Sequence, residues 1–183
     1  MADQIQRVAA EFIAEVCPHC ALCCNGVLFK DVELQPGDDG ANLKSLGLPV
    51  TGKQVAKFPQ PCAALVGCHC RVYANRPVRC REFDCALLQS LAEGKTTAAG
   101  ALRVIRDAQK RAEKVRRLLH TCGDDAERLA LSLRFQRTKR RLESSPFSEE
   151  AADAYSQLTL AVHDLNLLLH EKFYPSPEDP AER

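Results

Sequence analysis

The sequence predicts a mainly α-helical protein in which a small, cysteine-rich and loop-rich part is followed by a helical bundle. Nine of the ten cysteines lie between Cys17 and Cys85. The residues from 25 to 61 are rich in Gly and Pro, which is typical of turns. After Cys85, apolar residues recur with the period of a helix. The core must come mainly from Leu, Val, Ile and Ala, because aromatic residues make up only 5% of the chain.

The cysteine-rich part is expected to begin with a helix and to continue in loops. Apolar residues spaced by three or four predict a helix from Asp3 to Val16, and Pro18 ends it because proline lacks a backbone donor. From 25 to 61 we expect loops and a small hairpin, built from the alternating runs 27–29 and 32–34. So long a loop needs something other than a core to fix it, and metal bonds would serve.

Three long helices are predicted after Cys85. The first is capped by Thr96 or Thr97 and ends near Gly123, where glycine supplies the left-handed stop. The second runs from about 124 to 142, and the last from 145 to about 174 with Pro146 in its first turn. We expect the first to bury Leu102, Ile105, Ala108, Ala112, Val115 and Leu118 or Leu119, and the last to bury Tyr155, Leu158, Val162, Leu165 and Leu169.

The cysteines form two groups along the chain. The first group is the run Cys17-x2-Cys20-x2-Cys23-Cys24, and the second comprises Cys62, Cys68, Cys70, Cys80 and Cys85. Two thiolates separated by two residues can chelate one metal, because a tight turn brings both sulfurs to one side. The x2 spacing also matches the binding run of iron–sulfur clusters, whereas the adjacent Cys23 and Cys24 bind one metal together only with difficulty. Since each centre uses four ligands, one site drawn from both groups and two sites are both compatible with the count.

Some neighbouring residues have two interpretations. His19 and His69 lie between cysteines and are either further ligands or bystanders. Cys122, alone near a helix end, is expected to be a small buried hydrophobe. Positive charge stabilises a thiolate centre, so Arg76, Arg79 and Arg81 around Cys80 either support the metal or belong to a solvated loop. His120, His163 and His170 are expected to be structural or to face solvent.

The cellular compartment follows from what the sequence lacks. The N-terminus has no basic stretch followed by an apolar one, and nowhere does the chain reach the ~18 apolar residues that a membrane span needs. We therefore expect a cytoplasmic protein without membrane association. Thiols stay reduced there, so the cysteines are expected to be metal ligands or reactive groups rather than disulfides.

Several separated motifs resemble those of the bacterial CxxCxxCC cysteine-cluster family, described as a putative zinc- or iron-chelating domain. They are the cysteine run, Pro61-Cys62, Cys70-Arg71-Val72-Tyr73 and Arg76-Pro77-x2-Cys80-Arg81-x-Phe83. The resemblance covers residues 17 to 85 closely. It implies that the metal ligands are Cys17, Cys20, Cys23, Cys24, Cys62, Cys70, Cys80 and Cys85. Cys68 departs from the family pattern, which has one cysteine before the Val-Tyr step.

The resemblance and the helical pattern together suggest a cysteine-cluster metal-binding domain over 1–90, a helical region over 91–174 and a disordered tail over 175–183. The expected cofactor is an iron–sulfur cluster, with zinc as the alternative, because all-thiolate sites suit both. The expected role is accessory or structural, with the helical region as a surface for a protein partner.

The sequence also suggests two alternatives to the accessory role. Flagellin lysine N-methylases carry a related domain, so the resemblance also suggests an iron–sulfur-dependent redox or methyl-transfer enzyme. No Gly-rich turn that would hold a nucleotide-like cofactor accompanies it here, and no catalytic residue is evident. A zinc protein that binds nucleic acid through the basic residues 134–141 is disfavoured, because the net charge of the chain is only +1.

Overall fold

The computed structural model describes residues 16–144 and 148–175. The elements in order are η1 (Cys17–His19), β1 (Asp31–Glu33), α2 (Gly40–Ser45), β2 (Lys57–Pro59), β3 (Leu65–Val66), β4 (His69–Cys70), η2 (Tyr73–Asn75), α3 (Val78–Glu82), α4 (Ala86–Ala92), α5 (Ala98–Thr121), α6 (Leu131–Glu143) and α7 (Glu149–Lys172). Helices dominate and the strands are short, so the mainly α prediction is confirmed. The predicted first helix, except for Val16, and the tail from 176 onward lie outside the described residues.

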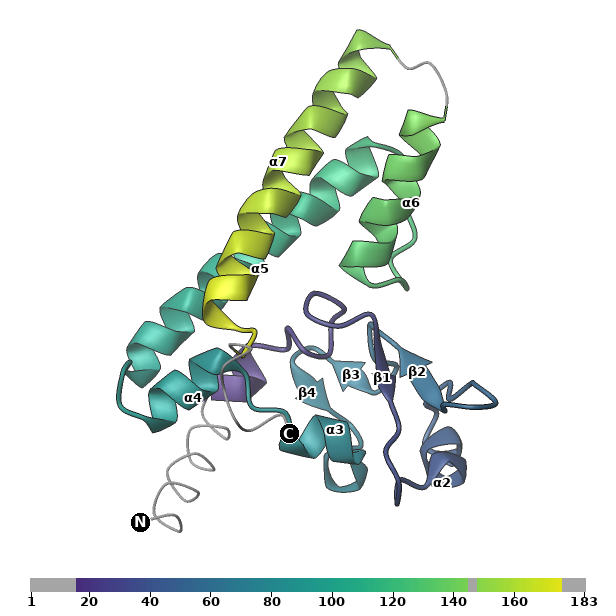
Figure 1. Ribbon diagram of the computed structural model, residues 1–183, viewed down its shortest axis with the longest axis vertical. Helices are drawn as coiled ribbons and strands as arrows, with labels where there is room; N and C mark the ends of the chain where they lie inside the picture. The colour runs from purple at the N-terminus through teal and green to yellow at the C-terminus, as the bar shows by residue number, and fades with distance from the viewer. Residues whose placement is uncertain (1–15, 145–147, 176–183) are drawn as a thin grey trace.

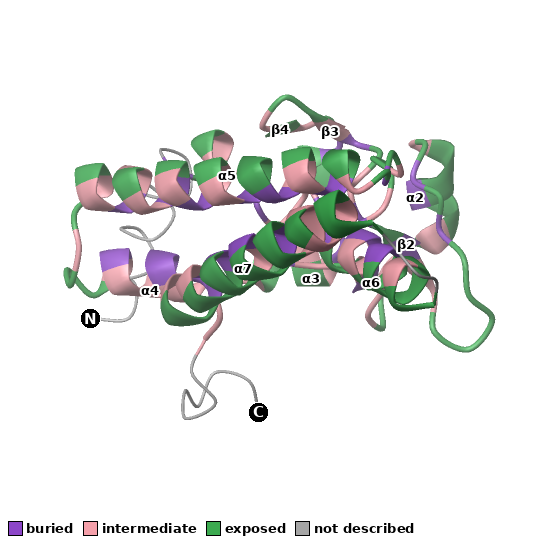
Figure 2. Cartoon of the chain, turned by 90° about the horizontal axis from the view of Figure 1, so that it is seen from above, coloured by how far each residue is buried: buried purple, intermediate pink, exposed green. Residues whose placement is uncertain are grey.

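The long helices α5 and α7 run antiparallel along the molecule, and α6 packs beside them (Figure 1). The α5 prediction is confirmed in its cap and its end: Thr97 Oγ1 accepts a 3.1 Å hydrogen bond from the N–H of Gly100, and Gly123 follows with a φ of 76°. Its buried face turns towards α7 and α4 (Figure 2). The residues buried on this face are Ala101, Ile105, Ala108, Ala112, Val115 and Leu119, so Ala101 is buried at the position where Leu102 was expected.

The helix predicted from about Asp124 begins later, at Leu131. Asp124 lies in the turn before the helix, and Arg134 Nε of α6 donates to its Oδ1 at 2.7 Å, so the turn is tied to the side of the helix. The N–H of Leu131 donates to the carbonyl oxygen of Gly26 at 2.8 Å, which fixes the helix start against the cysteine-rich part. The prediction was wrong at this boundary because tertiary contacts, rather than local propensity, set it.

The last helix, α7, is capped by Ser148, whose Oγ accepts from the N–H of Ala151 at 3.3 Å. The predicted start at 145 lies outside the described residues. Its buried residues are Leu158, Ala161, Leu165 and Leu169, whereas Tyr155 and Val162 are only partly buried. Within the described part of the chain, no helix is both long and apolar enough to cross a membrane.

The loop from 25 to 61 is more regular than predicted. The expected hairpin between 27–29 and 32–34 does not form; instead β1 pairs antiparallel with the distant β2, with Val32 opposite Phe58. Val27 and Leu28 enter the core instead of pairing. Helix α2 is also present, capped by Asp39, whose Oδ1 accepts from the N–H groups of Ala41 and Asn42.

Two separate cores hold the molecule together. The larger core joins α4, α5 and α7 to Leu22, Val27 and Leu28 of the cysteine-rich part. The smaller core fills the loop around Phe58 and comprises Val32, Leu43, Leu48, Val50, Phe58, Ala64 and Val72. Part of the turn-rich loop is therefore fixed by a core of its own, which its composition did not indicate.

Candidate metal centre

The cysteine run, comprising Cys17, Cys20, Cys23 and Cys24, is folded by two consecutive turns. The 3₁₀ turn η1 begins at Cys17, and Pro18 stands in its first turn. Ala21 then adopts a left-handed φ of 56°, and its carbonyl oxygen accepts from the N–H groups of Cys24 and Asn25, each at 2.9 Å. Alanine pays a steric penalty in this conformation, so the surrounding contacts must hold the turn.

Helix α5 supports the run from outside. Gln109 Nε2 donates hydrogen bonds to the carbonyl oxygens of His19 at 2.8 Å and of Cys20 at 3.1 Å. No sequence pattern pointed to Gln109, because its role depends on a contact between segments far apart in the chain. These bonds fix the backbone between two of the predicted ligands.

Cys62 lies directly against the run. Its N–H donates to the carbonyl oxygen of Cys24 at 2.8 Å, which closes the turn-rich loop at its base. Gly26 allows this approach: a Cβ there would lie 3.0 Å from the Cα of Ala130 and 3.2 Å from Cδ of Pro61. Its φ of 77° also favours glycine.

Cys68 and Cys70 both lie in a small hairpin. Strands β3 and β4 pair with Leu65 opposite Cys70 and Val66 opposite His69, so Gly67 and Cys68 form the tip. Successive strand residues face opposite sides, and accordingly Cys70 packs against the smaller core while His69 is exposed. Cys68 thus lies at the tip of the hairpin, and His69 lies on its exposed side.

The last two predicted ligands lie at short helices. Cys80 is carried by α3, whose first N–H, that of Val78, donates to Asp38 Oδ1 at 2.9 Å. Cys85 is the N-cap residue of α4, and the N–H of Ala86 beside it donates to the carbonyl oxygen of Phe173 at 3.2 Å. The beginning of α4 is therefore attached to the end of α7.

Burial is the largest cause of the raised thiol pKa values in this region. It raises the pKa of Cys17 and of Cys24 to about 11, and that of Cys20 and of Cys80 to about 12. As a whole residue Cys17 is exposed, yet the surroundings of its thiol group are dense enough to raise this pKa. The pKa values of Cys23, Cys62 and Cys85 are also raised, again chiefly by burial. Without a metal, these thiols are protonated at neutral pH.

The secondary causes of the raised pKa values show which thiols are neighbours. After burial, Cys85 is the largest cause of the raised pKa of Cys17. Among the thiols that raise the pKa of Cys23, Cys20 and Cys85 have the largest effects. Cys62 and Cys70 lead among those that raise the pKa of Cys24. The thiols that raise the pKa of Cys80 are Cys24, Cys62 and Cys70. All eight predicted ligands are therefore neighbours of at least one other, and Cys68 is not among the leading contributors to any of them.

Of the three predicted supporting arginines, only Arg76 is among the leading influences on these thiols. Its positive charge opposes the rise in the pKa of Cys17, Cys24 and Cys80. Its guanidinium carbon lies 3.7 Å from the centroid of the Tyr73 ring, and its Nη1 donates to the carbonyl oxygen of Cys80 at 3.3 Å. Arg79 and Arg81 are exposed, as the solvated-loop interpretation expects.

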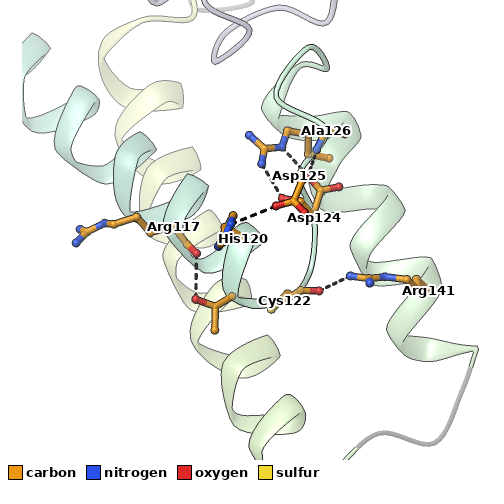
Figure 3. A network of polar contacts seen from close by, with 9 residues as sticks. Arg117, His120, Cys122, Asp124, Asp125, Ala126 and Arg141 are labelled. Atoms are coloured by element: carbon orange, nitrogen blue, oxygen red, sulfur yellow. Dashed lines mark hydrogen bonds and ion pairs between the residues drawn. The ribbon is translucent and has the colours of Figure 1, made fainter.

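Cys122 lies apart from the other cysteines, in the turn between α5 and α6 (Figure 3). It packs against the larger core and its carbonyl oxygen accepts from Arg141 Nη2. A cavity of about 560 Å³ opens at this turn and is lined by Asp124, Asp125 and three arginines of α6. No predicted ligand lines this cavity, so we place the candidate site at the thiols and not there. Arg134 in the basic stretch is buried against Asp124 and is not part of a solvated basic face.

The donor set fits a thiolate-bound metal, although the side chains do not enclose an ion as they stand. Among the described residues, no three Cys, His, Asp or Glu side chains are grouped so that they could hold an ion. A cavity of about 20 Å³ nevertheless lies between Cys17, Cys20 and Cys85, lined otherwise by apolar residues. That is room for one water-sized guest, so a four-iron cluster would require the lining side chains to move. Rotation about χ1 changes the position of each cysteine sulfur without moving the backbone.

Comparison with models of known protein families, with curated proteins and with solved structures found no match to this chain. The resemblance to the cysteine-cluster family remains a prediction from the motifs.

Proposed function

We propose that this protein binds metal through Cys17, Cys20, Cys23, Cys24, Cys62, Cys70, Cys80 and Cys85, and that the metal is held as an iron–sulfur cluster. The observation that carries the proposal is that these eight thiols, from segments as distant as the η1 turn and the beginning of α4, each lie near at least one other of the set. Thiols that are merely buried hydrophobes have no reason to gather in this way, and Cys122 does not join them.

The cluster is preferred to zinc because of the ligand spacing. Three cysteines at x2 intervals with a fourth from a distant segment are typical of four-iron clusters. Cys85 is such a distant neighbour of Cys17, Cys20 and Cys23. A bound cluster of this kind supplies one-electron transfer, while the chain's own residues hold the thiolates, exclude water on the side of the larger core and place the Arg76 charge nearby. We propose an accessory or structural role, with the helical region as partner surface.

Anaerobic purification followed by metal analysis and an absorption spectrum tests the proposal. We expect a brown protein that contains iron and acid-labile sulfide, and the Cys122→Ser variant as control should retain both. A colourless protein with stoichiometric zinc would exclude the cluster and leave metal binding by the thiols intact. A chain that retains no metal and takes none up on reconstitution would contradict the whole proposal.

A further inference from the structure

The eight thiols are divided between the two cores of the molecule. Cys20, Cys23 and Cys85 pack against the larger core, whereas Cys62, Cys70 and Cys80 pack against the smaller one. Figure 1 shows the same division, with η1 close to α4 and the end of α7, and β3, β4 and α3 gathered in the other part of the molecule. A single centre would have to draw ligands from both cores at once.

We propose that the eight cysteines form two metal centres of four thiols each: a first quartet of Cys17, Cys20, Cys23 and Cys85 and a second quartet of Cys24, Cys62, Cys70 and Cys80. The inference rests on the proposed function and goes beyond it by assigning a second site and the membership of both. Eight thiolates exceed the four protein ligands that a tetrahedral zinc or a four-iron cluster uses.

The cavity of about 20 Å³ supports the first quartet. Cys17, Cys20 and Cys85 line it, whereas Cys23 and all members of the second quartet do not. The rest of its wall comes from Val16, the leucines of α4, two residues of α5 and Phe173. An apolar wall on one side would keep water away from a metal held on the other.

The boundary between the quartets is the peptide bond between Cys23 and Cys24. Adjacent residues rarely direct both sulfurs at one metal, so a Cys-Cys pair is suited to serve two. The hydrogen bond from the N–H of Cys62 to the carbonyl oxygen of Cys24 places the backbone of Cys24 beside a member of the second quartet. Arg76 Nη1 donates to the carbonyl oxygen of Cys80 at 3.3 Å, which places a positive charge beside the second quartet.

Paired variants of the full chain test the assignment. We expect Cys20→Ser and Cys80→Ser each to lower the metal content to about half that of the wild type, when the two centres are of the same kind. Adding Cys85→Ser to Cys20→Ser should remove little more, whereas combining Cys20→Ser with Cys80→Ser should remove nearly all metal. If Cys20→Ser and Cys80→Ser each abolish binding while the helices remain folded by circular dichroism, there is one shared centre and the inference is wrong. Cys122→Ser is the matched control.

Titration of the reduced, metal-free wild type with Co²⁺ keeps the test independent of whether the variants fold. The thiolate-to-cobalt absorption should rise until about two equivalents are bound. Saturation at one equivalent would overturn the two-centre inference and leave the proposed function standing. No uptake of Co²⁺, together with no metal in the purified protein, would overturn the proposed function itself.

Discussion

The backbone N–H of Cys62 donates a 2.8 Å hydrogen bond to the carbonyl oxygen of Cys24, and this contact joins the two groups of cysteines. The residues between them contain β1, α2 and β2 and form the smaller core around Phe58. The loop is therefore closed by backbone bonding and filled by its own side chains. A metal would add to an arrangement that already brings the thiols near one another.

Gln109 is expected to support the cysteine run from α5. In Gln109→Met the chain loses two hydrogen bonds to the backbone of the run, at His19 and Cys20. We expect the free energy of unfolding to fall by about 1–2 kcal/mol, and the first quartet to lose metal more readily than the second. Urea unfolding and metal analysis measure the two effects. Gln136→Met, at an exposed position of α6, is the control and should change neither.

The metal-free, reduced chain is expected to lose stability as the pH rises above about 9. Burial raises the pKa of Cys20 to about 12 from the ordinary thiol value of 9.0, so the folded state favours the protonated thiol. Above pH 9 the Cys20 thiol loses its proton more easily in the unfolded chain than in the folded chain. The free energy of unfolding therefore falls progressively as the pH rises towards 12. Urea midpoints at pH 8 and pH 10 measure the loss.

Cys20→Ser provides the control for this pH dependence, because serine does not ionise in the range. The difference between pH 8 and pH 10 should be smaller in the variant, while the raised pKa values of Tyr155 and Tyr174 contribute equally to both proteins. Equal pH dependence in both chains would mean that the Cys20 thiol is not desolvated by the fold.

The helices could be predicted wherever their signals are local. The cap of α5 at Thr97, its apolar face and its end before Gly123 could each be predicted from residues close together in the sequence. The start of α6 could not be predicted in this way, because it depends on the contact of Arg134 with Asp124 and of Leu131 with Gly26. The pairing of β1 with β2 was missed for the same reason.

The candidate site was predicted as a set of residues and not as an arrangement. Spacing and motifs singled out the eight cysteines, but they did not predict that Cys68 would lie at the tip of a hairpin formed by β3 and β4. The division into quartets depends on which core each cysteine meets. No local sequence pattern predicts the contact of Gln109 with the cysteine run or that of Asp38 with α3, because both join segments far apart in the chain.

The ion pair of Asp124 and Arg134 is expected to be essential for the turn between α5 and α6. Both side chains are almost fully buried, at 6% and 5% exposed. Asp124→Ala leaves the Arg134 charge without its partner, and we expect a loss of about 3–5 kcal/mol. Asp125→Ala is the control: its contact with His120 is exposed (Figure 3), so the loss should be under about 1 kcal/mol. Thermal or urea unfolding compares the two.

A second substitution separates the lost ion pair from the uncompensated charge. If the buried Arg134 charge causes most of the loss, Asp124→Ala combined with Arg134→Met should be more stable than Asp124→Ala alone. A double variant that is less stable than either single variant would show that packing of the two side chains, and not their charges, holds the turn.

The backbone of Ala21 is expected to be strained, and a substitution that removes this strain should stabilise the folded cysteine run. Its φ of 56° costs alanine about 1–2 kcal/mol, whereas glycine adopts this conformation freely but loses about 0.5–1 kcal/mol through its more flexible unfolded chain. Ala21→Gly should therefore raise the free energy of unfolding by up to about 1 kcal/mol and retain the metal. Ala63→Gly is the matched control, because Ala63 is exposed and does not have a positive φ, and it should lower stability. If both substitutions destabilise the chain equally in urea, the backbone at Ala21 is not strained. The positions of Cys20, Cys23 and Cys24 must then be set by the hydrogen bonds of Gln109 and by the bond between Cys62 and Cys24.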